Sequence, residues 1–251
     1  MNYEALIITT TEIGFQLLKN GAETYRVEDS VTHVLKAYSD NVADINVFAI
    51  PNYLIISITT KDQITYTKTK RVLQRGQNID RIVKINSLCR YISQNKPDIS
   101  YINEQLEIIG NLKRYPLSYD LFSSCLTAFV FTLFYKGSLL DAIWALGIGA
   151  LVKINTNVMK KFRMNFFTTI IFNSFIIAVF AIVPYRFGIP FHYDSIIIGC
   201  FMLLVPGVAI TNSARDFIAG DLLSGTLRLF EAFLIATCIA LGSGVALSLL
   251  R

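Results

Sequence analysis

The residues best suited to bind a small solute follow a proline-glycine step within an apolar segment. Residues 195–214 read SIIIGCFMLLVPGVAITNSA, so that Pro206 and Gly207 interrupt the segment. Proline removes a backbone donor and glycine lets the chain bend, and together they predict a broken helix. In lipid, a broken helix is tolerated where protein buries it or where it lines a watery cavity, and transporters bind solute at such breaks. The pattern therefore favours a membrane transporter with a solute site near this step.

Polar and charged side chains close to the step are the candidates for contacting a solute. Arginine can hold a carboxylate in a bidentate contact, while an acidic side chain can bind an ammonium group or carry a coupling proton. Such groups are costly within a membrane, which makes them functional candidates. We assign the acidic role first to Asp216 and Asp221. The full set of predicted substrate-binding residues is Pro206, Gly207, Thr211, Asn212, Arg215, Asp216, Asp221, Arg228 and Glu231.

A structural explanation competes for the five charged members of this set. Arg215, Asp216 and Asp221 could lie at the membrane interface as solvated loop charges. Arg228 and Glu231 stand three residues apart on a predicted helix, where they could simply pair with each other. The sequence leaves both explanations open.

Several function classes lack their usual residues. We expect no enzymatic activity, catalytic residue, cofactor or metal, because the sequence holds no P-loop, nucleophile elbow or metal-ligand spacing. The net charge of +5 is spread along the chain without a basic block, which argues against a nucleic-acid partner. The four cysteines are isolated and are expected to be small buried apolar residues.

Two halves that differ in charge density must position the candidate residues. Residues 1–116 hold 14 Lys+Arg and 12 Asp+Glu, whereas residues 117–251 hold 9 and 6. The mean hydropathy of +0.49 is too high for a typical soluble domain. We therefore predict an α+β cytoplasmic N-terminal domain over residues 1–115. An all-α polytopic membrane domain with about five transmembrane helices should follow over residues 116–251.

Periodicity and apolar length predict the elements of each half. Helical spacing predicts helices over 3–20, 25–38, 79–94 and 100–109, and β-rich runs predict strands over 45–50, 53–58 and 63–69. The expected membrane spans cover about 117–135, 139–158, 164–185, 195–214 and 222–250.

Basic residues predict the orientation of the spans. Lys113 and Arg114 precede the first span, and Lys160, Lys161 and Arg163 separate the second from the third. Loops rich in lysine and arginine stay in the cytoplasm, so the N-terminal domain should be cytoplasmic and the C-terminus should lie outside.

Two stretches of the sequence resemble the bacterial threonine/serine exporter family. The first, LLKNGAETYRVEDSV over residues 17–31, contains Gly-Ala-Glu and Arg-Val-Glu elements that look like the family's N-terminal signature. The second is LVPGVAITNSARDFIAGDLLSGTLRLFEAFLIATCIALGSG, residues 204–244, and it includes the broken helix. In the first stretch, Gly21, Glu23, Arg26 and Glu28 are predicted to join the first two helices and to face the membrane half or a subunit partner. There Gly21 would supply a tight turn, and Arg26 could pair with Glu23 or another carboxylate. A helix-turn-helix corner with surface charges is the structural alternative for this stretch.

The resemblance implies a secondary exporter in the bacterial plasma (inner) membrane. Its expected substrates are small polar amino acids such as threonine and serine, or short dicarboxylates such as succinate, with transport coupled to the proton motive force. Full-length members carry a second hydrophobic half, so this chain is similar to a large subunit that works with a separately encoded small membrane subunit. Self-association into a homo-oligomer stays open. The alternatives are a non-transporting scaffold or sensor subunit and a membrane-anchored hydrolase.

Overall fold

The chain forms two compact units, and one of them combines segments that are distant in the sequence. The computed structural model describes residues 2–38, 40–73, 76–112, 115–189 and 191–250. The first unit comprises Met1–Lys113 together with Thr211–Arg228, and the second comprises Arg114–Ile210 together with Leu229–Arg251. The expected cytoplasmic position of Lys113 and Arg114 and the expected outer position of Arg251 lie outside the described residues.

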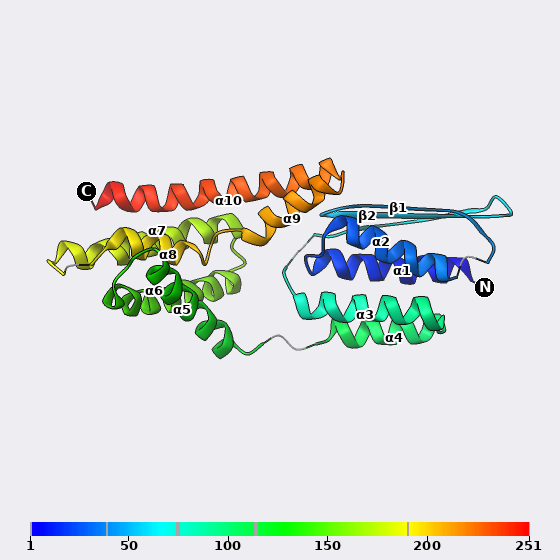
Figure 1. Ribbon diagram of the computed structural model, residues 1–251, viewed down its shortest axis with the longest axis horizontal. Helices are drawn as coiled ribbons and strands as arrows, with labels where there is room; N and C mark the ends of the chain where they lie inside the picture. The colour runs from blue at the N-terminus through cyan, green and yellow to red at the C-terminus, as the bar shows by residue number, and fades with distance from the viewer. Residues whose placement is uncertain (1, 39, 74–75, 113–114, 190, 251) are drawn as a thin grey trace. The chain divides into compact units, whose positions relative to one another are not determined.

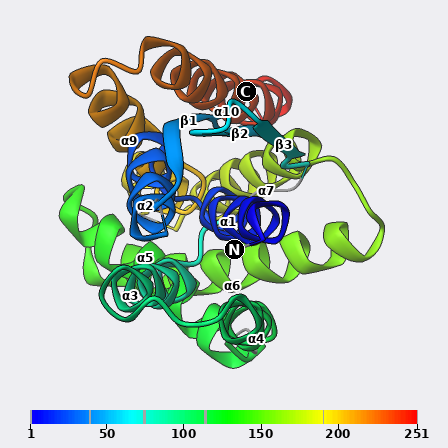
Figure 2. The same cartoon turned by 90° about the vertical axis from the view of Figure 1, so that its right-hand side faces the viewer.

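The first unit has three layers. Figures 1 and 2 show two helices packed on one face of a sheet, with a second helix pair beneath them. The sheet is an antiparallel meander in the order β1-β2-β3. The elements are α1 (Tyr3–Lys19), α2 (Thr24–Ala37), β1 (Val42–Ile50), β2 (Tyr53–Thr60), β3 (Thr65–Arg71), α3 (Ile79–Asn95) and α4 (Ile99–Gly110). The structure thus confirms the predicted α+β layout of helices and strands in this part of the chain.

Alternating and helical apolar patterns explain this arrangement. Leu54, Ile56 and Ile58 are fully buried at every second position of β2, so one face of the strand covers the helices. Leu6 and Ile13 of α1 are likewise fully buried in the same core. Burying each such side chain contributes about 1.5–3 kcal/mol relative to leaving it exposed. The predicted Pro51-Asn52 turn joins β1 to β2, with Ile50 paired to Tyr53.

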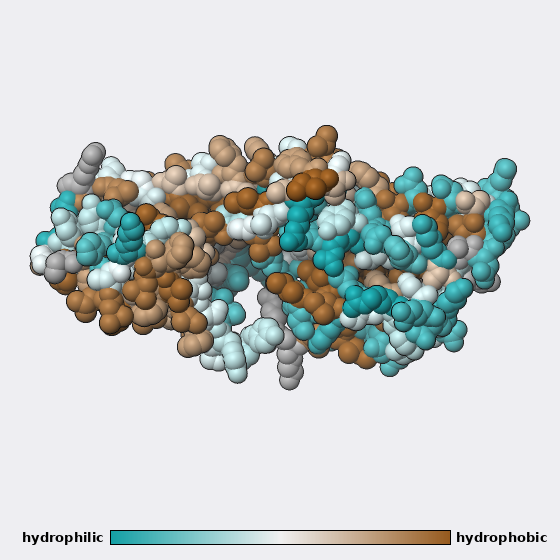
Figure 3. All heavy atoms as spheres, in the orientation of Figure 1, coloured by the Kyte–Doolittle hydropathy of each residue, from teal (hydrophilic) through white to brown (hydrophobic). Residues whose placement is uncertain are grey.

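The second unit is a helical bundle with an apolar surface. It contains α5 (Leu117–Phe134), α6 (Leu139–Lys161), α7 (Phe166–Arg186), α8 (Tyr193–Phe201) and most of α10 (Leu222–Leu249). In Figure 3 hydrophobic atoms gather on the surface of α5–α8 and α10. Only 11% of the apolar window of α5 is buried, so most of its apolar side chains are exposed, as in a helix that lies in a membrane. These helices therefore belong to a membrane protein.

The number of spans differs from the prediction. By length and composition, four helices in the described residues can cross a membrane, namely α5, α6, α7 and α10. The fourth expected span, residues 195–214, is divided between α8 and α9 (Gly207–Ile218). The nine residues of α8 reach only about 13.5 Å, against a hydrocarbon core of about 30 Å. The Pro206-Gly207 step explains why this segment is divided. Helix α8 ends at Phe201, before the step, and α9 begins at Gly207.

Close packing of α8 against α5 gives a first testable prediction. A Cβ on Gly199 would lie 2.6 Å from the backbone nitrogen of Thr132 and 2.7 Å from its Cα atom. Because backbone cannot move aside as a side chain can, Gly199→Ala should destabilise the bundle by about 1–3 kcal/mol. Thermal unfolding of the detergent-solubilised protein measures this change. Gly147→Ala is the matched control, since a Cβ there meets no atom within 4 Å; equal melting temperatures for the two variants would refute the packing argument.

Candidate functional site

The turn between α1 and α2 forms one side of the candidate site. Helix α1 ends at Lys19, and Gly21 then adopts φ +91°, a conformation that glycine reaches without strain. A Cβ at this position would also lie 2.9 Å from the carbonyl oxygen of Gly76. The chain therefore reverses over Gly21–Glu23, and α2 starts at Thr24. This geometry agrees with the predicted role of Gly21 in a tight turn.

The turn between α9 and α10 forms the other side. Gly220 has φ +87°, and the Oδ1 atom of Asp221 accepts a hydrogen bond from the backbone nitrogen of Ser224 at 3.1 Å, which caps the start of α10. The two helices pack closely because Gly225 has no Cβ, where one would lie 2.7 Å from the ring of Phe217. The hydroxyl of Ser213 also donates to the carbonyl of Gly225 at 2.7 Å.

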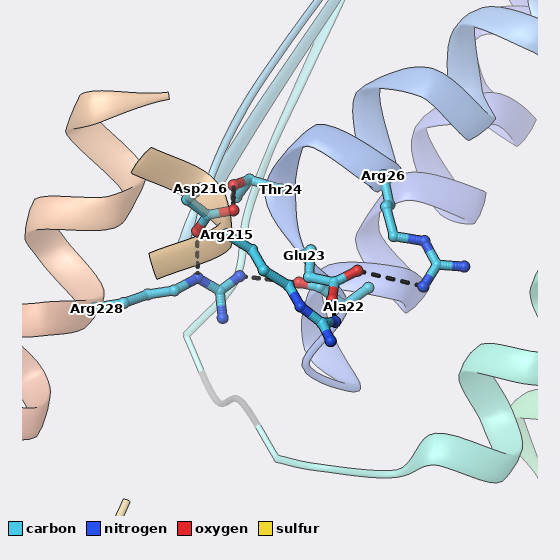
Figure 4. A network of polar contacts seen from close by, with 7 residues as sticks. All are labelled: Ala22, Glu23, Thr24, Arg26, Arg215, Asp216 and Arg228. Carbon is cyan, nitrogen blue, oxygen red and sulfur yellow. Dashed lines mark hydrogen bonds and ion pairs between the residues drawn. The ribbon is translucent and has the colours of Figure 1, made fainter. Parts of the chain in front are cut away.

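A buried ion pair lies where these two turns meet. The Nε atom of Arg228 is 2.9 Å from the Oδ2 atom of Asp216, and the two residues are 6% and 0% exposed. The hydroxyl of Thr24 donates to Asp216 at 3.0 Å, and the Nη2 atom of Arg228 donates to the carbonyl of Ala22 at 2.9 Å (Figure 4). Thr24 and Asp216 are 192 positions apart in the sequence, yet both belong to the first unit.

Glu23 extends this cluster toward the surface. Its buried carboxylate contacts two guanidinium groups, that of Arg26 at 3.2 Å and that of Arg215 (Figure 4). The side chains of Arg26 and Arg215 are 52% and 61% exposed. One carboxylate thus bridges an arginine of α2 and an arginine of α9. The sequence suggested the contact with Arg26 but not the contact with Arg215.

Burial controls the charge of the acids in this cluster. Desolvation raises the pKa of Asp216, although Arg228 and the Thr24 hydroxyl partly offset the shift, while Asp221 and Glu23 add to it. Burial also raises the pKa of Glu28, against the hydrogen bond from the backbone of Ala49, with smaller increases from Asp221 and Asp216. The neutral form of Asp216 is therefore favoured more than that of an exposed aspartate.

Some of the predicted site residues are in contact with one another. Glu23, Arg26, Arg215, Asp216 and Arg228 form the contact cluster, and Glu28 and Asp221 lie close enough to influence its charge. The solvated-charge explanation fits the exposed Arg215 but is wrong for Asp216, because this residue is fully buried.

The remaining predicted residues are distributed over both units. Pro206, Gly207 and Glu231 belong to the second unit, with Pro206 between α8 and α9 and Glu231 three residues past Arg228 on α10. Thr211 is exposed on α9, whereas Asn212 beside it is buried.

Sequence reasoning missed two sets of buried polar residues. Thr24 contacts Asp216, and its one signal was its position directly after the Gly-Ala-Glu element. In the second unit, the fully buried carboxylate of Asp141 accepts hydrogen bonds from the backbone of Ser138 at 2.6 Å and from the ring of His192 at 2.8 Å. An acid at the start of an apolar segment was the only hint of this pair.

Metal ligation finds no support in the described part of the chain. No group of three or more His, Cys, Asp or Glu residues there could hold a metal ion. The cluster itself offers recognition of charge by Arg228 and its neighbours and a buried acid, Asp216, with a raised pKa.

Comparison with known proteins identifies a family over almost the whole chain. The family model described as "Putative threonine/serine exporter" (ThrE) matches residues 9–250. Comparison with curated proteins and comparison with solved structures each gave no match.

Proposed function

Because the chain belongs to the threonine/serine exporter family, we propose that it exports small polar amino acids such as threonine and serine, or short dicarboxylates such as succinate. Membership and the four apolar helices make it a membrane protein of a transporter family rather than of an enzyme family. The substrate, the coupling and the site residues are our proposals. The observation that carries them is the buried ion pair between Asp216 and Arg228.

The pair offers the two charges that a zwitterionic amino acid needs. Arg228 can hold the substrate carboxylate bidentately, and Asp216 can hold the ammonium group. A dicarboxylate would use Arg228 together with the exposed Arg215. Each contact is stronger at this buried position than it would be in water. Because an unpaired buried charge is costly, the substrate must also supply an opposite charge to each side chain whose partner it displaces. We propose that substrate binding exchanges the internal ion pair for two pairs with the substrate.

Proton coupling follows from the charge of Asp216. Its pKa is raised by burial, so a proton can occupy it at a pH where exposed carboxylates stay ionised. A protonated Asp216 no longer balances Arg228, and the guanidinium becomes available to a substrate carboxylate. The substrate ammonium group can pair with Asp216 only after that proton has left. We propose this exchange as the step that links proton movement to export. From the sequence, Pro206, Gly207, Thr211, Asn212, Asp221 and Glu231 complete the proposed set of substrate-binding residues.

The proposal includes a location and a partner. Lys160, Lys161 and Arg163 at the end of α6 favour a cytoplasmic loop, which would put the N-terminal domain, residues 1–115, in the cytoplasm of a bacterial cell. The membrane domain, residues 116–251, would lie in the inner membrane with its C-terminus outside. That orientation needs an odd number of crossings, so residues 195–214, although divided between α8 and α9, would have to cross together with the four candidate spans. We also propose that the chain is a large subunit that works with a separately encoded small membrane subunit, as a heteromer or within a homo-oligomeric assembly.

An export assay tests the proposal directly. Cells loaded with labelled threonine, serine or succinate would express the chain, the small subunit or both, with and without an uncoupler. We expect efflux of at least one of the three solutes when both subunits are present, and its loss when the uncoupler collapses the proton gradient. Absence of efflux for all three solutes with both subunits in the membrane would overturn the proposed function.

A second candidate is a non-transporting scaffold or sensor subunit. The observation that favours it is that Asp221 caps α10 and Glu23 holds Arg215, so that these charges also have structural roles. In the same assay this candidate predicts that efflux by the small subunit does not depend on Asp216 or Arg228.

A further inference from the structure

A cavity of about 360 Å³ lies between α2 and α3 in the first unit. The cavity is open to solvent, and its lining residues come from these two helices alone. The polar ones include Arg26, Ser30, His33, Asn86, Arg90 and Ser93. The volume is within the range of pockets that bind small metabolites. None of the substrate-binding residues proposed above lines this cavity, so it is a separate feature of the molecule.

The charges around the cavity favour an anion. Arg26 and Arg90 bring two guanidinium groups, while Asp29 is the one acid among the described lining residues. The carboxylate of Asp29 lies 3.1 Å from the Nδ1 atom of His33, and the two guanidinium groups outnumber this one acid. Hydroxyl and amide groups of Ser30, Ser93 and Asn86 add neutral donors. Guanidinium groups bind carboxylate and phosphate through paired hydrogen bonds, which gives such a cavity a preference for these groups.

Thiol chemistry does not explain the cavity. Cys89 contributes to its lining, but burial raises the pKa of the Cys89 thiol to about 12. The thiol stays protonated at physiological pH and is therefore a poor nucleophile and a poor metal ligand. Recognition of a ligand by the surrounding donors remains as the chemistry that these residues support.

We propose that this cavity binds a small organic anion bearing a carboxylate or phosphate group, held by Arg26 and Arg90. The ligand lies at the edge of the cluster described above, since Arg26 also contacts Glu23 and Glu23 contacts Arg215. An anion on Arg26 competes with Glu23 for the same guanidinium. Binding in the cavity is thereby coupled to the α9–α10 turn, and the coupling works in both directions.

Calorimetric titration of the full-length protein in detergent, with sodium succinate and with sodium phosphate at constant ionic strength, tests the proposal. We expect at least one of the two anions to bind with a Kd of about 1 mM or lower. Arg90→Gln should weaken that binding by about tenfold or more, because it removes one of two charged donors. Arg71→Gln, which changes an exposed arginine on β3 outside the cavity, is the matched control and should leave the Kd unchanged.

Two further variants separate this site from the proposed transport site. Glu23→Gln removes the competing carboxylate, so it should tighten anion binding several-fold, opposite in sign to Arg90→Gln. The double variant Asp216→Asn/Arg228→Gln, which lacks the proposed transport site, should still bind phosphate with a Kd within a few-fold of the wild-type value, even if it fails to export. Two results would overturn the proposal whatever the outcome of the export assay. One is that neither succinate nor phosphate binds, and the other is that Arg90→Gln and wild type bind the anion with equal affinity.

Discussion

The double variant Asp216→Asn/Arg228→Gln is expected to fold and to reach the membrane, but to export neither amino acid nor dicarboxylate above the level of cells that lack the protein. Neutral polar side chains replace both members of the buried pair, so no buried charge is left without a partner. The same change removes the cation for the substrate carboxylate and the acid for the proton. Export of labelled threonine, serine and succinate, normalised to the amount of protein in the membrane, measures the effect.

A second ion pair provides the control for this variant. Asp80 and Lys84 on α3 lie 3.3 Å apart, and their side chains are about half exposed. Exposed pairs contribute little to stability, and Asp80→Asn/Lys84→Gln should therefore export normally. Normal export by Asp216→Asn/Arg228→Gln would show that the buried pair serves only to join the two turns. The proposed substrate site would then be wrong.

Arg228→Gln alone should lower the free energy of unfolding by about 3–5 kcal/mol at neutral pH, the usual cost of removing one member of a buried ion pair. It leaves the Asp216 carboxylate buried without its cation and takes a donor from the carbonyl of Ala22. Denaturant unfolding of the detergent-solubilised protein measures the difference from wild type.

The loss caused by Arg228→Gln should depend on pH. Burial already raises the pKa of Asp216, and removing Arg228 raises it further. A carboxyl with a raised folded-state pKa contributes stability that is present below its unfolded pKa and is lost as the pH rises through the folded pKa. The deficit should therefore be smaller at about pH 4.5 than at about pH 7.5, because the protonated carboxyl no longer needs the cation.

Arg215→Gln is the matched control for the stability measurement. Arg215 is 61% exposed, and its partner Glu23 keeps the contact with Arg26, so the expected loss is about 1 kcal/mol or less. Equal losses in the two arginine variants, or a deficit for Arg228→Gln that grows as the pH falls, would be incompatible with a buried pair whose acid has a raised pKa.

Local chemistry explains which features the sequence determined by itself. Alternation of apolar residues over 53–58 predicted a strand with one buried face, and Leu54, Ile56 and Ile58 are buried as expected. The Pro206-Gly207 step predicted a helix break, and α8 ends before it while α9 begins at Gly207. These outcomes depend on a few neighbouring residues, because backbone donors, side-chain period and turn conformation act over one or two turns of chain.

The number of spans required more than local chemistry. Residues 195–214 are apolar enough to suggest one membrane helix, but Thr211 and the residues after it pack with the first unit. Hydropathy measures how apolar a segment is and contains no information about which part of the fold will bury it. The structure therefore reduces five expected spans to four candidates.

The sequence was sufficient to identify most residues of the candidate site, but not the side chains that each of them contacts. A Pro-Gly break with acids and arginines behind it indicated Asp216 and Arg228, and the Gly-Ala-Glu and Arg-Val-Glu elements indicated Glu23 and Arg26. Only the tertiary structure brought Thr24 to Asp216 and Glu23 to Arg215, each across 192 positions. Spacing in the chain cannot predict such contacts, because they form when the packing of two helical turns offsets the entropy lost in closing a loop of that length. Burial of Asp216, which raises its pKa and makes it a candidate proton carrier, is a consequence of that packing alone.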